Sequence, residues 1–305
     1  MSRAVSFSSY GEPEVLEVVE VPEPHAGDGQ VRVAVRTAGL NPFDVKVRHG
    51  VLPKLALPSL QGSEFAGVVD EVGAGVTGWH AGDEVLGWIG RGAQAEHVVV
   101  PSTSLAAKPT ALDWLTAGGI GLVGNTAKRA TDSLALGSAD TVLVSGAAGG
   151  VGLLGSQLAR LTGATVIGTA SPRNHDALRA LGIVPVAYGE GMLERLREAA
   201  PQGITAMLDT VGGESIDVAL ALGVPAARIN TIADSAAAAR HGLGSVGGGG
   251  KTSEELGELA RLAADGALVL PIRASYPMGE VRAAYGDLES GHGLGKIVLV
   301  VSPTD

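Results

Sequence analysis

The stretch VSGAAGGVG at residues 144–152 is where residue types and spacing point most directly to chemistry. Four of its nine residues are glycine, and the stretch follows an apolar, strand-like run and precedes an apolar run with helical spacing. Glycines at such a junction permit a tight turn and bring backbone N–H groups close to an anion at the helix N-terminus. The pattern predicts a dinucleotide site, with glycines that serve only packing as the alternative. The residues predicted to hold the pyrophosphate are Ala148, Gly149, Gly150 and Val151.

The end of the next strand bears on which dinucleotide binds. A site for NAD usually carries an acidic residue about 20 residues after the glycines, to hold the ribose hydroxyls. Here the segment GTASPRNH at 168–175 has no acid before Asp176, and it offers Ser171 and Arg173 instead. A guanidinium and a hydroxyl bind a 2′-phosphate, which a carboxylate would repel. The sequence therefore predicts NADPH as the cofactor; a helix-capping Ser171 and a solvated Arg173 form an alternative that can hold at the same time.

The elements that position these residues alternate between strand and helix from about residue 113. Strand-like runs at 165–170, 185–188, 204–212 and 227–233 are separated by segments with helical periodicity. This order is typical of a doubly wound, parallel Rossmann sheet, in which ligands bind at the carboxyl ends of the strands. Residues expected at those ends are Tyr188, covering the adenosine end, and Val211 and Gly212, offering backbone contacts.

Two other regions of the chain, 1–112 and 235–250, differ from this pattern of alternating strands and helices. Residues 1–112 read as short alternating strands joined by Gly/Pro turns, and are therefore expected to be mostly β. The segment at 235–250 is compositionally simple, and two interpretations stay open for it: a flexible loop, or a loop ordered by ligand. A strand is expected near 243–247, at an edge of the sheet.

Composition excludes several classes of function. The net charge of −10 argues against general binding to nucleic acid, which would be repelled. No apolar run is long enough to predict a membrane span, and the N-terminus reads as a strand without the apolar core of a signal peptide, so a cytoplasmic location is expected. Because the chain has no cysteine, it offers neither a thiol nucleophile nor a cysteine-based zinc site.

Five ordered segments together resemble the zinc-independent branch of the medium-chain dehydrogenase/reductase superfamily, near the quinone oxidoreductases. They are AGLNPFDVKVRHG at 38–50, the Gly-x-Glu and Gly-Asp-x-Val block at 60–87, the glycine loop, LDTVGG at 208–213 and GHGLGKIVL at 291–299. The resemblance implies an α/β protein with a GroES-like, β-rich catalytic domain at 1–112 and 268–305. A Rossmann domain at 113–267 would bind the cofactor, and the active site would lie in the cleft between the two.

The departures from the family pattern concern the metal and the pocket. Zinc-bearing relatives have Cys at the position of Asn41 and His at that of Ser63, and neither Asn nor Ser is a good zinc ligand. No catalytic metal is therefore expected. Leu52, Lys128 and Leu294 stand where the quinone reductase pattern tends to have Tyr, Tyr and Arg, which predicts a more apolar pocket without a phenol as proton donor.

The resemblance also assigns roles to single residues. It implies that Asn41 and Asp44 line the substrate side, the Asn41 amide donating to a carbonyl oxygen, and that Thr126 lies near the nicotinamide or its phosphates. The alternatives are a turn before proline for Asn41, and a helix-capping hydrogen bond or one between segments for Asp44. Glu64 is expected to pair inside the fold, and Lys296 either approaches the cofactor or lies at a strand edge.

These expectations combine into an NADPH-dependent oxidoreductase that transfers hydride, without metal, to a quinone or to the C=C of an α,β-unsaturated carbonyl. In enzyme classification this is the EC 1.6.5 or 1.3.1 type. A pathway-specific reductase of enones or enoyl thioesters and a non-catalytic NADPH-binding sensor stay open as alternatives. The expected partner is a small carbonyl or quinone substrate, and the expected assembly is a homodimer, extending the sheet at the strand near 243–247.

Overall fold

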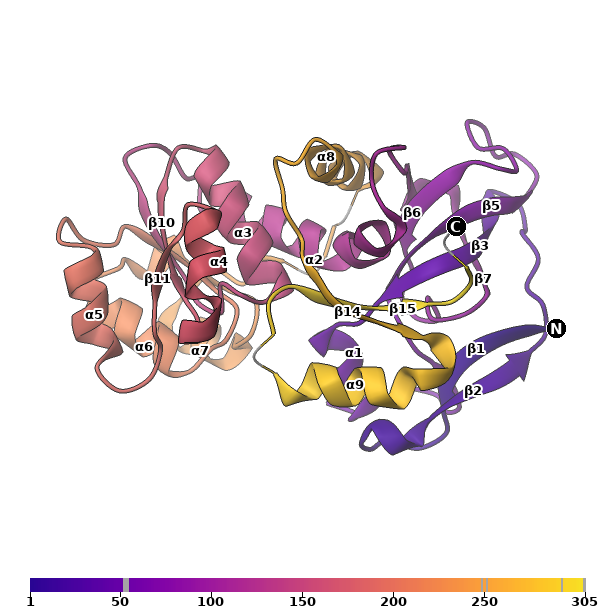
Figure 1. The fold of residues 1–305 in the computed structure, drawn as a ribbon, viewed down its shortest axis with the longest axis horizontal. Coiled ribbons are helices and arrows are strands. Elements are labelled where there is room, and N and C mark those ends of the chain that lie inside the picture. The colour runs from indigo at the N-terminus through magenta and orange to yellow at the C-terminus, as the bar shows by residue number, and fades with distance from the viewer. Residues whose placement is uncertain (52–54, 248, 251, 292, 304–305) are drawn as a thin grey trace. The chain divides into compact units, whose positions relative to one another are not determined.

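The computed structural model describes residues 1–51, 55–247, 249–250, 252–291 and 293–303 (Figure 1). Contacts between Cα atoms divide the chain into two units. The first comprises Met1–Leu122, Lys251–Ala267 and Pro271–Asp305, and the second comprises Val123–Gly250 and Leu268–Leu270. The domain boundaries inferred from the sequence, a catalytic domain at 1–112 and 268–305 and a cofactor-binding domain at 113–267, stay predictions. Leu52 lies outside the described residues.

The first unit is rich in β structure. Its three-stranded sheet has the order β2-β1-β4, and its seven-stranded sheet has the order β14-β15-β3-β5-β6-β8, with β7 also paired to β3. The strands are β1 (Ser2–Phe7), β2 (Leu16–Val21), β3 (Gln30–Gly39), β4 (Ser59–Leu60), β5 (Glu64–Val72), β6 (Glu84–Trp88), β7 (His97–Pro101), β8 (Leu105–Ala107), β14 (Ile272–Pro277) and β15 (Lys296–Val300). Over its first seven residues, β3 alternates between half-buried and buried positions, as expected for a strand with one face on a core.

Three helices belong wholly to the first unit: α1 (Pro42–Arg48), α8 (Ser253–Ala264) and α9 (Val281–Ser290). A fourth, α2 (Trp114–Asp132), runs from the first unit into the second. A continuous hydrophobic core joins the sheets to α9, through residues such as Phe7, Leu40, Phe65 and Tyr285. The late strand β15 lies between β14 and β3 in the middle of this unit (Figure 1).

The second unit is built on a five-stranded, all-parallel sheet with the order β11-β10-β9-β12-β13. The strands are β9 (Thr141–Val144), β10 (Thr165–Thr169), β11 (Val184–Val186), β12 (Ala206–Asp209) and β13 (Ile229–Thr231). The helices are α3 (Gly150–Leu161), α4 (His175–Ala180), α5 (Met192–Ala199), α6 (Glu214–Ala221) and α7 (Ser235–His241). β12 is buried throughout, as expected for a parallel strand with both faces covered. The predicted doubly wound sheet and the β-rich first half are thereby confirmed.

The segment at 235–250 differs from both interpretations offered by its composition. Residues 235–241 form helix α7, whose first turn is capped by the Asp234 carboxylate accepting from the Ala237 N–H. The prediction of a strand near 243–247 is wrong: Gly244 makes an isolated bridge to Asn230, and residues 243–247 form no regular strand. The Asn230 side chain takes the place of a strand partner, bonding both the N–H and the carbonyl of Val246.

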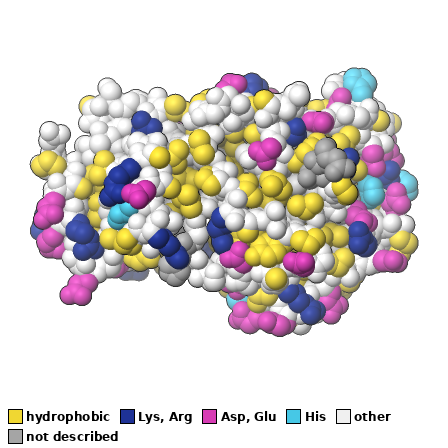
Figure 2. All heavy atoms as spheres, viewed as in Figure 1, with side chains coloured by type: hydrophobic (Ala, Val, Ile, Leu, Met, Phe, Trp, Pro, Cys, Tyr) yellow, Lys and Arg dark blue, Asp and Glu magenta, His cyan; other side chains and the backbone are white. Residues whose placement is uncertain are grey.

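Charge is dispersed over the face shown in Figure 2, where Lys and Arg side chains lie singly among acidic and apolar ones. None of the helices in the described residues combines the length and the apolar character that a membrane span requires.

Candidate functional site

The glycine loop follows β9 and leads into α3 at the carboxyl end of the sheet. Gly146 has φ +62°, a conformation that favours glycine, and its carbonyl accepts from the Gly149 N–H at 2.9 Å. In the described part of the chain, the N–H groups of Ala148, Gly150 and Val151 make no intramolecular hydrogen bond. Three backbone donors at a helix N-terminus are a suitable binding site for a pyrophosphate.

Two details of this loop differ from the sequence-based picture. The left-handed residue is Gly146, whereas Gly149 has φ −78°. The N–H of Gly149 is already bonded within the loop and cannot serve an anion, so the contribution left to Gly149 is the space where a Cβ would stand. Gly152 packs closely against the loop, because a Cβ there would lie 2.3 Å from the Gly146 oxygen.

The residues after β10 and β11 are exposed to different degrees. Ser171 precedes the short 3-10 helix Pro172–Asn174 as its N-cap residue, although its hydroxyl makes no capping hydrogen bond, and it is half-buried. Arg173 lies within that helix and is exposed. Tyr188 lies two residues beyond the end of β11 and is 51% exposed. These side chains are therefore accessible to a ligand at the carboxyl edge of the sheet.

The segment after β12 borders the glycine loop. Val211 is 60% exposed, and a Cβ added at Gly146 would meet the Val211 side chain at 2.9 Å. Gly212 is buried and donates its N–H to the Asp209 carboxylate. Thr126, on α2, is 8% exposed and packs beside Gly247. The structure thus brings Val211 to the glycine loop, whereas Ser171, Arg173 and Tyr188 follow the two neighbouring strands.

The two residues assigned to the substrate lie at the start of α1, in the first unit. Pro42 is the first residue of this helix, and the Asp44 carboxylate accepts from the Asn41 backbone N–H at 3.0 Å. The other Asp44 oxygen accepts from the Ser63 hydroxyl at 2.8 Å. Burial raises the pKa of Asp44 to about 6, against the opposing effects of the Ser63 hydrogen bond and the Lys296 charge. This geometry is that of the capping alternative for Asp44.

The Asn41 side chain belongs to a buried ion-pair network. The Lys296 ammonium contacts the Leu40 carbonyl at 2.6 Å, Asn41 Oδ1 at 2.7 Å and Glu64 Oε1 at 2.8 Å. Asn41 Nδ2 donates to the same Glu64 oxygen at 2.8 Å. Because an ammonium group can only donate, the atom of Asn41 that faces it is the carbonyl oxygen, and the orientation of the amide is defined.

Glu64 extends this network to α2. It is fully buried, and its second oxygen accepts from the Leu122 N–H at 2.6 Å. Lys296 is 4% exposed and lies on β15, 232 residues further along the chain than Glu64. The expectation that Glu64 pairs inside the fold agrees with this geometry, and Lys296 is its partner.

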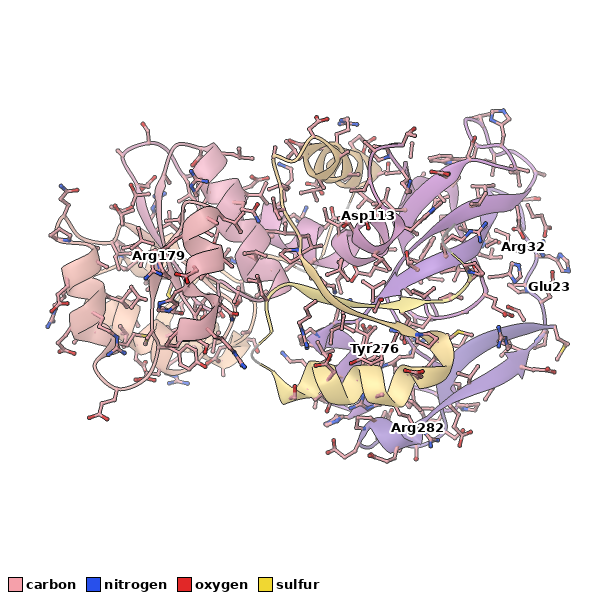
Figure 3. All side chains as sticks on the ribbon, viewed as in Figure 1. Glu23, Arg32, Asp113, Arg179, Tyr276 and Arg282 are labelled. Carbon is pink, nitrogen blue, oxygen red and sulfur yellow. The ribbon has the colours of Figure 1, made fainter. Side chains whose placement is uncertain are left out.

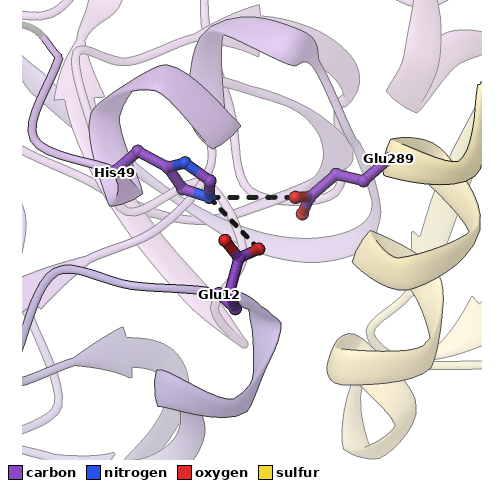
Figure 4. Close-up of side chains that lie close together, drawn as sticks. All are labelled: Glu12, His49 and Glu289. Carbon is purple, nitrogen blue, oxygen red and sulfur yellow. Dashed lines mark ion pairs between the residues drawn. The ribbon is translucent and has the colours of Figure 1, made fainter.

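One exposed group of side chains has the composition of a metal site. Within the described residues, Glu12, His49 and Glu289 are the three potential ligands that approach one another closely (Figure 4). The buried Arg48 guanidinium already neutralises Glu289 at 2.5 Å and lies 3.0 Å from His49 Nε2. This cluster is an ion-pair network at the surface, in which a cation is already present.

Sequence reasoning assigned no role to Asp209, although it lies within the quoted LDTVGG segment. Its carboxylate is fully buried and accepts hydrogen bonds from the Ser145 and Thr231 hydroxyls and from the N–H groups of Val211 and Gly212. The sequence did offer one signal for Asp209: it is an acidic residue that directly precedes 210–212, the segment expected to contact the ligand.

Two protein families match parts of the sequence. Residues 27–110 match the alcohol dehydrogenase GroES-like domain, and residues 184–299 match the zinc-binding dehydrogenase family. The glycine loop lies between the two matched ranges.

Solved structures resemble the chain over almost its whole length. The quinone oxidoreductase from Coxiella burnetii is 31% identical, with a TM-score of 0.88 and 99% of each chain covered. The Escherichia coli quinone oxidoreductase complexed with NADPH is 26% identical, with a TM-score of 0.88, 99% of this chain covered and 100% of that one.

Among curated proteins, the polyketide synthase GfsB of Streptomyces halstedii is 35% identical over 291 residues, which are 90% of this chain and 5% of the synthase. The chain spans between 5% and 40% of the length of the first curated relatives that it matches. The likeness to the quinone oxidoreductase from Coxiella burnetii, at 31% identity over the full length of both chains, shows that this chain belongs to the medium-chain dehydrogenase/reductase superfamily of oxidoreductases.

Proposed function

We propose that the chain is an NADPH-dependent oxidoreductase whose second unit holds the cofactor. The observation that carries this proposal is the glycine loop, in which the N–H groups of Ala148, Gly150 and Val151 bond to no other group among the described residues, at the N-terminus of α3. Gly146 and Gly152 keep that loop tight, and Gly149 carries no Cβ that would obstruct a phosphate. The residues present therefore fit a pyrophosphate.

The preference for NADPH rests on the end of β10. Ser171 and Arg173 lie there, accessible and without an acid among their neighbours up to Asp176. The Escherichia coli relative, which was solved with NADPH, supports the same cofactor. Thr126 and Tyr188 complete the proposed set of cofactor contacts, together with Val211 and Gly212. The N–H groups of Val211 and Gly212 already donate to Asp209, so the proposed contacts of these two residues use their other atoms.

Bound NADPH would supply a hydride to a quinone or to the β-carbon of an α,β-unsaturated carbonyl. The proposed contribution of the chain is to bind and orient the acceptor through Asn41. One N–H of its side-chain nitrogen points to Glu64, and the second would donate to the carbonyl oxygen of the acceptor. Asp44 fixes the start of the helix that carries this amide.

Independence from metal is part of the proposal. Asn41 and Ser63, the positions at which zinc-bearing relatives have ligands, are occupied by internal hydrogen bonds to Glu64, Lys296 and Asp44. The Lys296 ammonium lies against two of the oxygens that a cation would seek there, and a second cation would be repelled.

Reduction of an enoyl thioester is a second candidate, and one observation favours it. Three polyketide synthases match 90–95% of this chain at 34–35% identity, whereas five curated quinone oxidoreductases and quinone oxidoreductase-like proteins match 28–43% of it. Those synthases are far longer than this chain, so the match concerns one part of each.

The test is NADPH oxidation by the purified chain, followed at 340 nm against a panel of quinones, enones and enoyl thioesters. Turnover of quinones or simple enones supports the main proposal, and turnover of enoyl thioesters alone supports the second. Tight binding of NADPH without turnover of any acceptor would identify a sensor, and failure to bind any nicotinamide cofactor would refute both proposals.

The edge of the parallel sheet at β13 bears on the assembly of the protein. We infer a homodimer, because β13 is the last strand at one edge of the parallel sheet. Beyond β13 the sheet extends only through the isolated bridge between Asn230 and Gly244, so most of this edge can pair with a second copy. Light scattering that gives a monomer mass across micromolar concentrations would contradict it. A cytoplasmic location stays a prediction.

A further inference from the structure

The proposed function makes no use of Asp209, the last residue of β12. Its side chain is 0% exposed, and within the described residues no Lys, Arg or His forms an ion pair with it. Its partners are donors of hydrogen bonds: the hydroxyls of Ser145 and Thr231, each at 2.6 Å, and the N–H groups of Val211 and Gly212, at 3.2 Å and 3.0 Å. A buried charge with so many directed donors requires an explanation.

The carboxylate joins the carboxyl ends of three neighbouring strands. Ser145 follows β9 directly, Asp209 ends β12, and Thr231 ends β13. The Ser145 hydroxyl in turn accepts from the Thr210 N–H at 2.8 Å, and the Thr210 hydroxyl donates to the Ser145 carbonyl at 2.7 Å. The turn after β12 is therefore fixed to the residue that begins the glycine loop.

The two loops also touch at Gly146. A Cβ placed there would lie 2.7 Å from Thr210 Oγ1 and 2.9 Å from the Val211 side chain. The position of Val211 and the path of the glycine loop therefore depend on each other, and both depend on the carboxylate beneath them.

We infer that Asp209 is a positioning residue that holds the glycine loop and the 210–212 turn in register for the cofactor. A charged acceptor makes stronger hydrogen bonds than a neutral one, so the two loops keep one arrangement before the ligand arrives. This inference rests on the proposed NADPH site, to which it adds the group that sets the geometry.

Asp140 offers a matched control at the opposite end of the same strands. It precedes β9, and its carboxylate accepts from the Thr205 hydroxyl at 2.6 Å, the Arg228 guanidinium at 2.6 Å and the Gly137 N–H at 2.9 Å. Thr205 precedes β12 and Arg228 precedes β13. Asp140 thus joins the same strands at their amino ends, where ligands of such sheets do not bind.

The experiment compares Asp209→Asn with Asp140→Asn by thermal melting and by titration of NADPH followed by nicotinamide fluorescence. Both variants are expected to melt at a lower temperature than the wild type. Asp209→Asn should raise the Kd for NADPH about ten-fold, because Gly212 N–H and the Thr231 hydroxyl lose a charged acceptor. Asp140→Asn should leave that Kd within about two-fold, the range expected for a change away from the ligand.

A milder variant covers the case in which Asp209→Asn does not fold. Thr231→Val removes one donor to Asp209 from β13, outside both loops, and is expected to raise the Kd for NADPH about three-fold. Equal Kd values for the wild type and for the folded Asp209 or Thr231 variant would overturn the inference and leave the proposed function intact. A wild type that binds no NADPH would overturn the proposed function and, with it, this inference.

Discussion

Gly152→Ala tests the glycine loop most directly, because the cost can be worked from the structure. The added Cβ would lie 2.3 Å from the Gly146 oxygen and 2.8 Å from the Gly146 carbonyl carbon, both backbone atoms. Ordinary contact begins near 3.4 Å, so α3 or the loop must move by about 1 Å. Overpacking of this kind costs about 1–3 kcal/mol, and a backbone contact at 2.3 Å puts Gly152→Ala in the upper part of that range, at about 2–3 kcal/mol. The better helix propensity of alanine returns about 1 kcal/mol.

The expected net loss is about 1–2 kcal/mol, which lowers the melting temperature by about 3–8 °C. The same displacement misplaces the N–H groups of Gly150 and Val151, so NADPH should bind more weakly as well. Gly149→Ala is the matched control: its Cβ would meet only the Gly146 oxygen, at 3.4 Å, and φ is −78°. That variant should melt within about 2 °C of the wild type.

Gly149→Val separates binding from folding. Its branched side chain would occupy the space proposed for phosphate oxygens, so NADPH affinity should fall by orders of magnitude while the melting temperature stays close to that of Gly149→Ala. Thermal melts and cofactor titrations on the three variants decide the matter. A Gly152→Ala protein that melts with the wild type would refute the packing argument, and a Gly149→Val protein that binds NADPH normally would refute the assignment of this loop.

Four further predictions follow from other parts of the structure. Arg173→Ala should weaken NADPH about ten-fold and leave NADH unchanged, whereas Arg179→Ala, which removes an exposed arginine paired with its neighbour on α4 (Figure 3), should alter neither Kd; equal wild-type affinity for both cofactors would contradict this. Burial raises the pKa of Asp44 from 3.8 to about 6, so the folded chain holds that proton more tightly than the unfolded chain; this stabilisation is complete below pH 4 and is lost as pH rises through 6. Relative to Asp44→Asn, the wild type should therefore lose about 3 kcal/mol of unfolding free energy between pH 4 and 7 in urea titrations, and parallel curves would disprove it. Lys296→Met leaves the Glu64 charge buried without its partner and should cost about 3–5 kcal/mol, of which a second change, Glu64→Gln, recovers part; an additive double variant would speak against the pairing. Treatment with a chelator should change neither melting temperature nor activity, and near-stoichiometric zinc in elemental analysis, with activity lost on its removal, would count against metal independence.

The parallel sheet could be predicted because its signals are local. The strands from β9 to β12 are short, mainly apolar runs, and adjacent glycines in the sequence predict the turn at Gly146. Helix α2 gave no such signal, since Gly118, Gly119 and Gly121 are unfavourable in a helix. For Gly118 the reason is tertiary: a Cβ there would lie 2.2 Å from the Thr37 hydroxyl, which no local pattern reveals.

The candidate site divides in the same way. Asn41 and the glycine loop could be selected from the sequence, because each belongs to a motif of a few consecutive residues. The pairing of Lys296 with Glu64 joins residues 232 positions apart, and the hydroxyls of Ser145 and Thr231 meet at Asp209 only when three strands align. Contacts between residues so far apart in the sequence depend on the topology of the fold, which composition and periodicity do not specify.

The place of β15 in the first unit has a consequence for biosynthesis. The strand pairs with β3 on one side and β14 on the other, and it carries Lys296 to Asn41 and Glu64 (Figure 1). On the ribosome, β3 emerges long before β15: the more than 250 residues between them take about 13–50 s to translate. During that time residues 37–39 of β3, which later pair with β15, have no strand partner on that side, and Glu64 lacks the Lys296 ammonium. The second unit, by contrast, has nearly all its residues by position 250 and all of them by position 270, so it can fold first. The network of Asn41, Glu64 and Lys296, proposed to face the substrate, is thus assembled last, after the parallel sheet of the second unit is complete.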